Sequence, residues 1–398
     1  MTAKSDSVYT QIDVPEIINA VGYATRVGGS RVSDAVVNAM ADAQHAYVQI
    51  DDLQAAAWRV IAEVTGAEAG IVTCGAAAGL TLGAAACLTG LDVEKMDQLP
   101  DITGFARNQI IYPRLGPYHY DHAVRLCGAD MIEIDFGADD ALQQIRASIG
   151  PRTAAIGYAW HGVDERPAIH DLAELAHEHD LPLLVDGAMS LPPADNLRDF
   201  MRRGADLVTF SGGKHLGGPQ ASGILCGRRD LIRAAWLQMV DMDVRPQTWS
   251  LRHWIDAGWV DRAPRHGIGR SMKVGKEAIV GLIAALQAYD QRDHAAEQSA
   301  WRDIVDTLAE RLSDLPSLAV QPLFPAPNGQ PFSVLRLELQ GGPQMTDLID
   351  ALSAHRPRII LSEHETDPNQ AYVYPMCLKA EDLEIIASAI RQHLDPHA

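Results

Sequence analysis

Basic charge, paired cysteines and an apolar leader are scarce or missing in this sequence. Its 33 Lys and Arg residues face 52 Asp and Glu residues, which leaves a formal charge of −19. Because nucleic-acid surfaces need clustered basic side chains, this balance disfavours a nucleic-acid partner. The five cysteines are dispersed without metal-ligand spacing, so we expect reduced thiols, a cytoplasmic location and no metal site. The first twenty residues hold no apolar core of a secretory signal.

Long apolar runs are also few. The stretch 69–91 is uncharged and of membrane-spanning length, but Ala and Gly dominate it. That composition is typical of a helix packed closely on a sheet, so we expect no membrane span. The nucleotide-binding motifs GK[ST] and GxGxxG are absent at the glycine-rich turns, and no serine lies in a GxSxG elbow. A nucleotide-binding loop and a hydrolase triad are therefore not supported.

The middle of the chain alternates β-rich runs with helical stretches. This alternation is typical of βαβ units and of a mostly parallel sheet. We predict strands at 69–74, 108–114, 130–136, 153–160, 181–186, 206–211 and 222–227, and helices at 142–150 and 169–180.

After residue 275 the pattern changes. We predict one long amphipathic helix over 276–312, strands at 332–340 and 357–363, and a final helix at 380–394. The expected organisation is an N-terminal segment 1–50 that carries an active-site loop, a large α/β domain 51–275 and a small α+β C-terminal domain 276–398.

The strongest chemical signal surrounds Lys214. A β-rich run ends at Ser211, and the lysine follows within the segment SGGKHLGGP, with glycines on both sides. A solvated structural lysine tolerates any neighbours, whereas a lysine that forms a Schiff base must approach a planar ring closely. The pattern therefore favours a reactive amine at Lys214.

A second signal lies upstream at Asp186. This residue ends the apolar run LPLLVD, and ligands of open α/β sheets bind at that end of the strands. A carboxylate there can pair with the pyridine nitrogen of pyridoxal 5'-phosphate (PLP). The alternative role is a helix N-cap.

A third signal is the turn of small residues at 73–79, which leads into an Ala-rich stretch. Backbone N–H groups at such a turn can bind a phosphate, although the same residues also permit close packing of a helix on a sheet. Together the three signals match the fold-type I PLP-dependent transferase fold.

More closely, the chain resembles the group related to selenocysteine synthase, and within it proteins similar to D-glucosaminate-6-phosphate ammonia-lyase. The resemblance lies in residues 18–33, 72–90, 120–130, 183–193, 206–223 and 267–286. It covers most of the first 290 residues, with SGGKHLGGP and GRSMKVGKE as its most specific parts.

The resemblance implies roles for individual residues. Lys214 would carry PLP as a Schiff base and Asp186 would pair with the ring nitrogen. The cofactor set that it implies is completed by Gly75, Ala76 and Ala77 at the phosphate, by Ser211 and Gly269, and by a ring that stacks on the pyridine, for which His122 comes before His119.

Substrate contacts are expected from a separate set of residues. Arg270 and Lys273 would reach a phosphate or substrate anion, from the neighbouring subunit of a homodimer or a higher oligomer. Arg26 and Arg31 flank a glycine turn and suit a substrate carboxylate, which guanidinium groups bind bidentately. His161 follows a predicted strand and is a further candidate, with a structural role equally open.

These residues predict a PLP-dependent lyase that eliminates the hydroxyl and amino groups of a hydroxylated amino acid to give a 2-keto acid and ammonia. Lys214 would remove the α-proton, which requires a lowered pKa. A racemase or epimerase and an aldolase share the first steps and stay open. A transferase acting on aminoacyl-tRNA is disfavoured by the acidic charge, and a relative without cofactor by the joint presence of Lys214 and Asp186.

Overall fold

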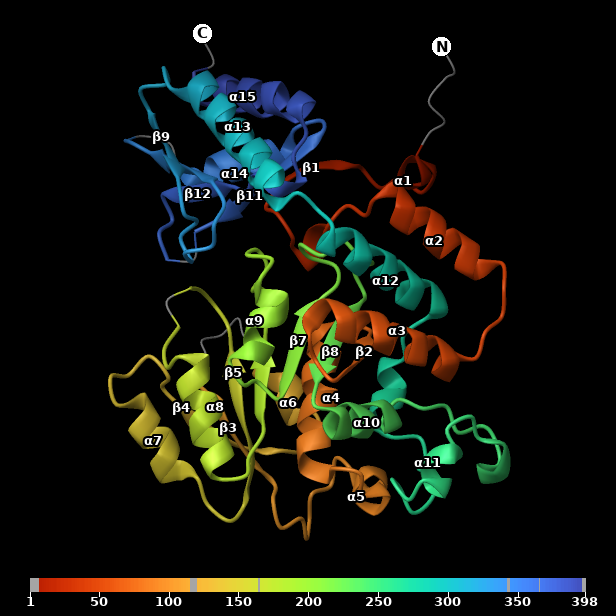
Figure 1. The fold of residues 1–398 in the computed structure, drawn as a ribbon. Helices are drawn as coiled ribbons and strands as arrows, with labels where there is room; N and C mark the ends of the chain where they lie inside the picture. Colours follow the sequence, from red (N-terminus) through yellow and green to blue (C-terminus); the bar gives the residue numbers. More distant parts are fainter. Residues whose placement is uncertain (1–6, 115–119, 164, 342–343, 365, 396–398) are drawn as a thin grey trace. The chain divides into compact units, whose positions relative to one another are not determined.

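The computed structural model describes residues 7–114, 120–163, 165–341, 344–364 and 366–395 (Figure 1). The chain forms two compact units. The larger comprises Val32–Arg292, and the smaller combines Met1–Arg31 with Asp293–Ala398. The division at residues 50 and 275 that the sequence led us to expect has different bounds and stays a prediction.

A seven-stranded sheet forms the centre of the larger unit, in the order β2-β8-β7-β6-β5-β3-β4. Only the pairs made by β8 are antiparallel; the other pairs are parallel. The strands are β2 (Ala69–Thr73), β3 (Gln109–Pro113), β4 (Asp130–Ile134), β5 (Thr153–Ala159), β6 (Leu183–Asp186), β7 (Leu207–Ser211) and β8 (Gly223–Gly227). All seven predicted strands are confirmed, and with them the α/β class.

Helices pack on both faces of this sheet and form two separate apolar cores. One core includes residues of α4 (Ala76–Thr89), α5 (Val93–Gln98), α6 (Asp121–Arg125), α10 (Arg229–Leu237) and α11 (His253–Asp256). The other includes residues of α3 (Ile50–Thr65), α7 (Ala141–Ser148), α8 (Ile169–Glu178), α9 (Asn196–Arg202) and α12 (Lys276–Asp290), against which α2 (Asp34–Gln44) packs. The predicted helices at 142–150 and 169–180 are α7 and α8.

The uncharged stretch 69–91 forms strand β2 and helix α4, as its small residues predict. A Cβ at Gly79 would lie 2.3 Å from Thr209 Oγ1, and one at Gly83 would lie 2.9 Å from a Leu184 methyl carbon. Glycine therefore lets α4 approach the sheet closely. Among the described helices, none combines the length and apolar character that a membrane span requires.

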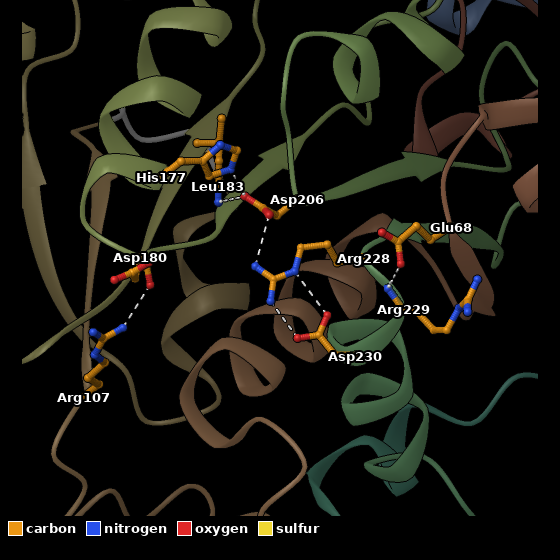
Figure 2. Close-up of polar contacts among 9 residues, drawn as sticks. All are labelled: Glu68, Arg107, His177, Asp180, Leu183, Asp206, Arg228, Arg229 and Asp230. Carbon is orange, nitrogen blue, oxygen red and sulfur yellow. Dashed lines mark hydrogen bonds and ion pairs between the residues drawn. The ribbon is translucent and has the colours of Figure 1, made fainter. Parts of the chain in front are cut away.

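The amino edge of the larger sheet is held by a network of charges around Asp206, which we call the Asp206 network (Figure 2). Asp206 is 6% exposed and accepts hydrogen bonds from the Leu183 N–H at 2.8 Å and from Arg228 at 3.2 Å. His177 Nε2 lies 2.8 Å from the same carboxylate, and Arg228 also contacts Asp230. Arg228 forms ion pairs with both Asp206 and Asp230, and this pairing together with the Leu183 N–H offsets the cost of burying Asp206.

The smaller unit contains a five-stranded sheet in the order β1-β11-β12-β10-β9. Strand β1 (Ile17–Ala20) pairs in parallel with β11 (Arg358–Glu363), so the N-terminal segment completes a sheet built from the C-terminal residues. The other strands are β9 (Leu318–Leu323), β10 (Val334–Leu339) and β12 (Gln370–Val373); the helices are α1 (Val8–Gln11), α13 (His294–Leu312), α14 (Met345–Ala354) and α15 (Ala380–Leu394). The predicted strands at 332–340 and 357–363 and the final helix are confirmed.

The prediction of one helix over 276–312 is wrong, because two helices occupy this segment. Helix α12 ends at Asp290 and α13 begins at His294. The Asp293 carboxylate accepts a hydrogen bond from the Ala296 N–H at 2.9 Å and so caps the second helix. Residues 290–294 are all polar but include neither Gly nor Pro, so the pattern alone did not mark the break.

Candidate cofactor site at the carboxyl edge of the larger sheet

Three strands of the larger sheet end side by side at the edge opposite the Asp206 network. Asp186 is the last residue of β6 and lies beside Thr209 of β7. Ser211 ends β7 and Thr73 ends β2, and both are paired with Gly223 of the intervening strand β8. The carboxyl ends of β2, β6 and β7 thus bring the three predicted signals to one edge, where open α/β sheets bind ligands.

The glycines around Lys214 are required by the packing of the turn itself. A Cβ at Gly213 would lie 2.4 Å from Gln220 Cα, and one at Gly212 would lie 2.1 Å from Ser222 Oγ. The Gly212 N–H donates to the Ser222 carbonyl at 2.9 Å, which closes the turn over residues 212–222. The packing of the turn therefore requires glycine at positions 212 and 213, whether or not a ligand binds there.

The Lys214 amine lies in a largely enclosed environment. Burial lowers the pKa of this amine, and the nearby Asp186 carboxylate partly opposes that effect. Within the described ranges the amine has no hydrogen-bond or ion-pair partner. A buried amine without a partner is costly to keep charged, so Lys214 is suited to act as a neutral nucleophile or base.

Asp186 is oriented by the peptide that follows its strand. The Ala188 N–H donates to Asp186 Oδ1 at 3.0 Å, and the Asp186 carbonyl accepts from the Trp160 N–H at 2.9 Å. The side chain is half-buried. These contacts fix the position of the carboxylate at the centre of the edge. A carboxylate that pairs with a protonated ring nitrogen has to be fixed in this way.

Helix α4 begins at the same edge and points its first N–H groups outward. Its N-cap Gly75 has φ +150° and carries no side chain that could accept from them. A Cβ at Gly223 would lie 2.6 Å from the Gly75 carbonyl carbon, which places the turn directly against β8. An anion is stabilised by such a helix terminus.

These features fit PLP, which is planar, carries a phosphate and binds lysine through its aldehyde. Among the described residues the Lys214 amine has no hydrogen-bond or ion-pair partner, the Asp186 carboxylate lies nearby, and the first N–H groups of α4 have no side-chain cap. The present residues could therefore hold the cofactor without rearrangement of the strands.

The predicted stacking and strand-end residues lie around this edge with varied exposure. His122 is exposed on α6, and His119 lies outside the described residues. His161 is exposed just after β5, and its Nδ1 lies 2.8 Å from the Ala159 carbonyl oxygen. Ser211 is half-buried at the end of β7. The stacking role of His122 stays a prediction.

The predicted anion-binding segment lies beside a different part of α4. A Cβ at Gly269 would lie 2.6 Å from a Leu82 methyl carbon, in the middle of the helix rather than at its start. Arg270 forms an ion pair with Asp241 at 2.8 Å, and Lys273 is exposed. Both cations line a cavity of about 370 Å³ in the larger unit.

Arg26 and Arg31 belong to the smaller unit. Arg26 lies in a short 3-10 helix, Thr25–Val27, which is followed by Gly28 and Gly29 with φ of +93° and +74°. Arg31 is exposed and lines a cavity of about 670 Å³ together with Cys377 and Lys379. The smaller unit therefore presents cations at the glycine turn, as predicted for a carboxylate site.

Sequence reasoning missed Tyr112 and Thr209. The Tyr112 ring covers Gly157, and its hydroxyl has no hydrogen-bond partner among the described residues. Burial raises the pKa of Tyr112 well above its usual range, and Asp186 and Asp121 add to the shift. Thr209 donates to the Ala76 carbonyl and so connects the start of α4 to β7. Neither residue forms part of a linear motif, so no sequence signal marked it.

Comparison with known proteins places this arrangement in a family. The model of the SelA family, described as L-seryl-tRNA selenium transferase, matches residues 17–242. This match spans more than half of the chain, and the chain therefore belongs to this family. The family resemblance inferred from the sequence is confirmed.

Two curated relatives are similar over long stretches. D-glucosaminate-6-phosphate ammonia lyase of Salmonella typhimurium is 32% identical over 72% of this chain and 70% of its own length. A 5'-C-glycyluridine monooxygenase-decarboxylase of a Streptomyces species is 29% identical over 98% of this chain and 92% of its own length.

Solved structures show the same fold. A structure of D-glucosaminate-6-phosphate ammonia-lyase has a TM-score of 0.80 and 26% identity, and covers 98% of this chain and 99% of its own. The cysteine desulfurase CsdA of Escherichia coli, with a TM-score of 0.55 and 17% identity over 92% of both chains, supports the fold alone. The chain is thus a fold-type I enzyme that uses PLP.

Proposed function

We propose that this enzyme is a lyase that eliminates water from a hydroxylated amino acid, and that hydrolysis of the dehydrated product then gives a 2-keto acid and free ammonia. The observation that carries the proposal is the buried Lys214 amine beside Asp186, in a chain that is 32% identical to an ammonia lyase. The structure of an ammonia-lyase with a TM-score of 0.80 supports the same reaction class.

Each residue of the edge has a defined task in this proposal. PLP, when bound, supplies an electron sink that acidifies the α-proton of an attached amino acid. Asp186 holds the proton on the ring nitrogen, and the first N–H groups of α4, from Gly75 to Ala77, bind the phosphate. Burial lowers the pKa of Lys214 Nζ, which favours its use as the base that accepts the α-proton. The β-hydroxyl leaves as water, and hydrolysis of the released product gives the keto acid and ammonia.

The substrate is an amino acid carried free in solution, with further contacts from the cations that the sequence indicates. We assign the substrate anion to Arg26 and Arg31, and a second anionic group to Arg270 and Lys273. We also propose a homodimer or a higher oligomer, in which the segment around Arg270 reaches the neighbouring subunit. An aminoacyl-tRNA substrate is disfavoured by the charge of −19. The cytoplasmic location stays a prediction from the dispersed cysteines.

A second candidate function is an oxidative decarboxylation. The specific observation in its favour is that the monooxygenase-decarboxylase covers 98% of this chain, whereas the ammonia lyase of Salmonella covers 72%. The lyase releases ammonia and a keto acid without dioxygen, whereas an oxidative decarboxylation consumes dioxygen and releases carbon dioxide.

One experiment separates the candidates. The purified enzyme is incubated with a panel of hydroxylated amino acids, and ammonia, keto acid, carbon dioxide and dioxygen are measured together. The lyase predicts equal amounts of ammonia and keto acid without dioxygen uptake. Dioxygen uptake with carbon dioxide release would instead establish the second candidate, and deuterium exchange at Cα without product would favour a racemase.

The role of Lys214 is tested separately. The wild-type enzyme should show the visible absorbance of lysine-bound PLP, and Lys214→Ala should lose it. Lys95→Ala is the matched control, because Lys95 is half-buried on helix α5 and contacts Asp92 and the Phe105 ring. Retention of the band in Lys214→Ala would show that another lysine carries the cofactor.

A further inference from the structure

The residue that follows Lys214 connects the lysine turn to helix α12. His215 is 2% exposed, and its Nδ1 lies 3.1 Å from Tyr289 Oη, with which it shares a hydrogen bond. The two rings meet edge to face, with centroids 5.2 Å apart and an interplanar angle of 86°. Tyr289 lies in the last turn of α12 and is fully buried. The orientation of the imidazole is therefore set by a helix distant in sequence.

The backbone after Lys214 is held by the same end of α12. Arg292 Nη1 donates to the His215 carbonyl oxygen at 3.3 Å. The Arg292 guanidinium carbon lies 4.9 Å from the Tyr289 ring centroid, which orients the arginine by a cation–π contact. Side chain and peptide of His215 are thus both attached to the α12 terminus.

The turn itself adds backbone bonds on either side of the lysine. The Lys214 carbonyl accepts from the Gly217 N–H at 3.0 Å, and the Gly212 carbonyl accepts from the Gly218 N–H at 2.8 Å. Consecutive peptide groups after the lysine therefore have partners. This leaves rotation of the side chain as the main freedom of the Lys214 amine.

A polar pair at this place is not what core packing alone requires. Tyr289 belongs to the same apolar core as Leu216, Leu282 and Leu286, and His215 beside it is 2% exposed, so an apolar side chain there would avoid the cost of burying an imidazole. A hydrogen-bonded pair is directional, whereas apolar contacts are not. The presence of the polar pair is explained if its directional hydrogen bond orients the residues next to Lys214.

We propose that His215 and Tyr289 are positioning residues for Lys214, which fix the direction from which its amine reaches the cofactor. The proposal rests on Lys214 as the cofactor lysine. Misplacement of a reacting group by about 1 Å can slow a step by about 100-fold, so loss of the pair should affect the rate of linkage more than the binding of PLP.

The test follows the formation of the covalent linkage in the full-length chain. Protein freed of cofactor is mixed with PLP, and the visible band is recorded over time at several PLP concentrations. In this step Lys214 Nζ bonds to the aldehyde carbon and one water leaves. The saturating first-order rate reports the attack of the amine, and the PLP concentration at half saturation reports binding.

Two variants remove the pair. Tyr289→Phe deletes one oxygen and His215→Leu deletes the imidazole. Both should lower the saturating rate by about 10-fold or more, with little change in the half-saturating PLP concentration. Tyr158→Phe is the matched control, because Tyr158 is 1% exposed and its hydroxyl has no hydrogen-bond partner among the described residues.

Unchanged rates in Tyr289→Phe would overturn the proposal, and so would an equal loss of rate in Tyr158→Phe. If His215→Leu does not fold, Tyr289→Phe decides alone, because it preserves shape. Absence of a band in the wild type, or its persistence in Lys214→Ala, would instead refute the assignment of the cofactor lysine and thereby the proposed function.

Discussion

The two edges of the larger sheet hold buried ionisable groups in opposite ways. At the amino edge, Asp206 has partners in His177, Arg228 and the Leu183 N–H (Figure 2). At the carboxyl edge, the Lys214 amine has no such partner within the described residues, and its pKa is lowered by burial. The amino ends of these strands thus carry a carboxylate that has partners. Their carboxyl ends carry an amine that has none among the described residues and is left reactive.

This difference indicates that the amino edge contributes mainly to the stability of the fold and the carboxyl edge mainly to the reaction. A satisfied network contributes to folding, whereas a buried group without partners costs free energy and is retained when a reaction needs it. Substitutions at the carboxyl edge should therefore affect turnover, and substitutions at the amino edge should affect the free energy of unfolding.

The largest expected effect is that of Lys214→Ala on turnover. Loss of the general base should lower the rate by about 1,000-fold or more. The free energy of unfolding should fall little or rise, because the variant no longer buries an unpaired amine. Turnover of the identified substrate and urea unfolding of the same preparation check both parts; a large loss of stability would contradict the comparison.

Asp186→Asn should have the next largest effect on turnover. The amide preserves the shape of the side chain but not the negative charge that keeps the ring nitrogen protonated, so turnover should fall by about 100-fold. Bound PLP should still be detected by its absorbance. A turnover close to that of the wild type would show that Asp186 does not act on the ring.

Asp206→Ala tests the amino edge. The Leu183 N–H, the Arg228 guanidinium and the His177 ring lose a partner, so the free energy of unfolding should fall by about 2 kcal/mol. Asp206→Asn keeps an acceptor and should lose less. Urea unfolding measures both variants, and the turnover per folded molecule should match that of the wild type in each.

The smallest expected effect is a pH dependence of stability. The folded-state pKa of Lys214 lies below its unfolded value, so between the two values the unfolded chain binds more protons and stability rises with pH. Cofactor-free wild type should therefore be less stable than Lys214→Met at low pH, and the gap should narrow as pH rises through that window. A gap independent of pH would contradict the lowered pKa.

Local patterns predicted most of the larger unit. All seven strands followed from short β-rich runs, and Lys214, Asp186 and the turn before α4 were found because strand ends are recognisable. The site residues Tyr112 and Thr209 were not found, because their importance depends on strand neighbours such as Gly157. The pair of His215 and Tyr289 joins residues far apart in sequence, and no linear motif records such a contact.

The break between α12 and α13 shows a second limit. Asp293 caps α13, but our prediction rested on the amphipathic pattern on either side of this residue and did not use the cap. The pairing of β1 with β11 could not be predicted at all, since either unit could have taken the N-terminal strand.

That pairing has a consequence for how the chain is made. Ile17 is synthesised before the larger unit, and its partner Arg358 after it. The whole larger unit is therefore translated while β1 lacks its neighbour, so the smaller sheet closes a very long loop only once Arg358 has been made. A C-terminal fragment that begins at Asp293 would therefore lack an edge strand, and the intact larger unit would be the better candidate for independent expression.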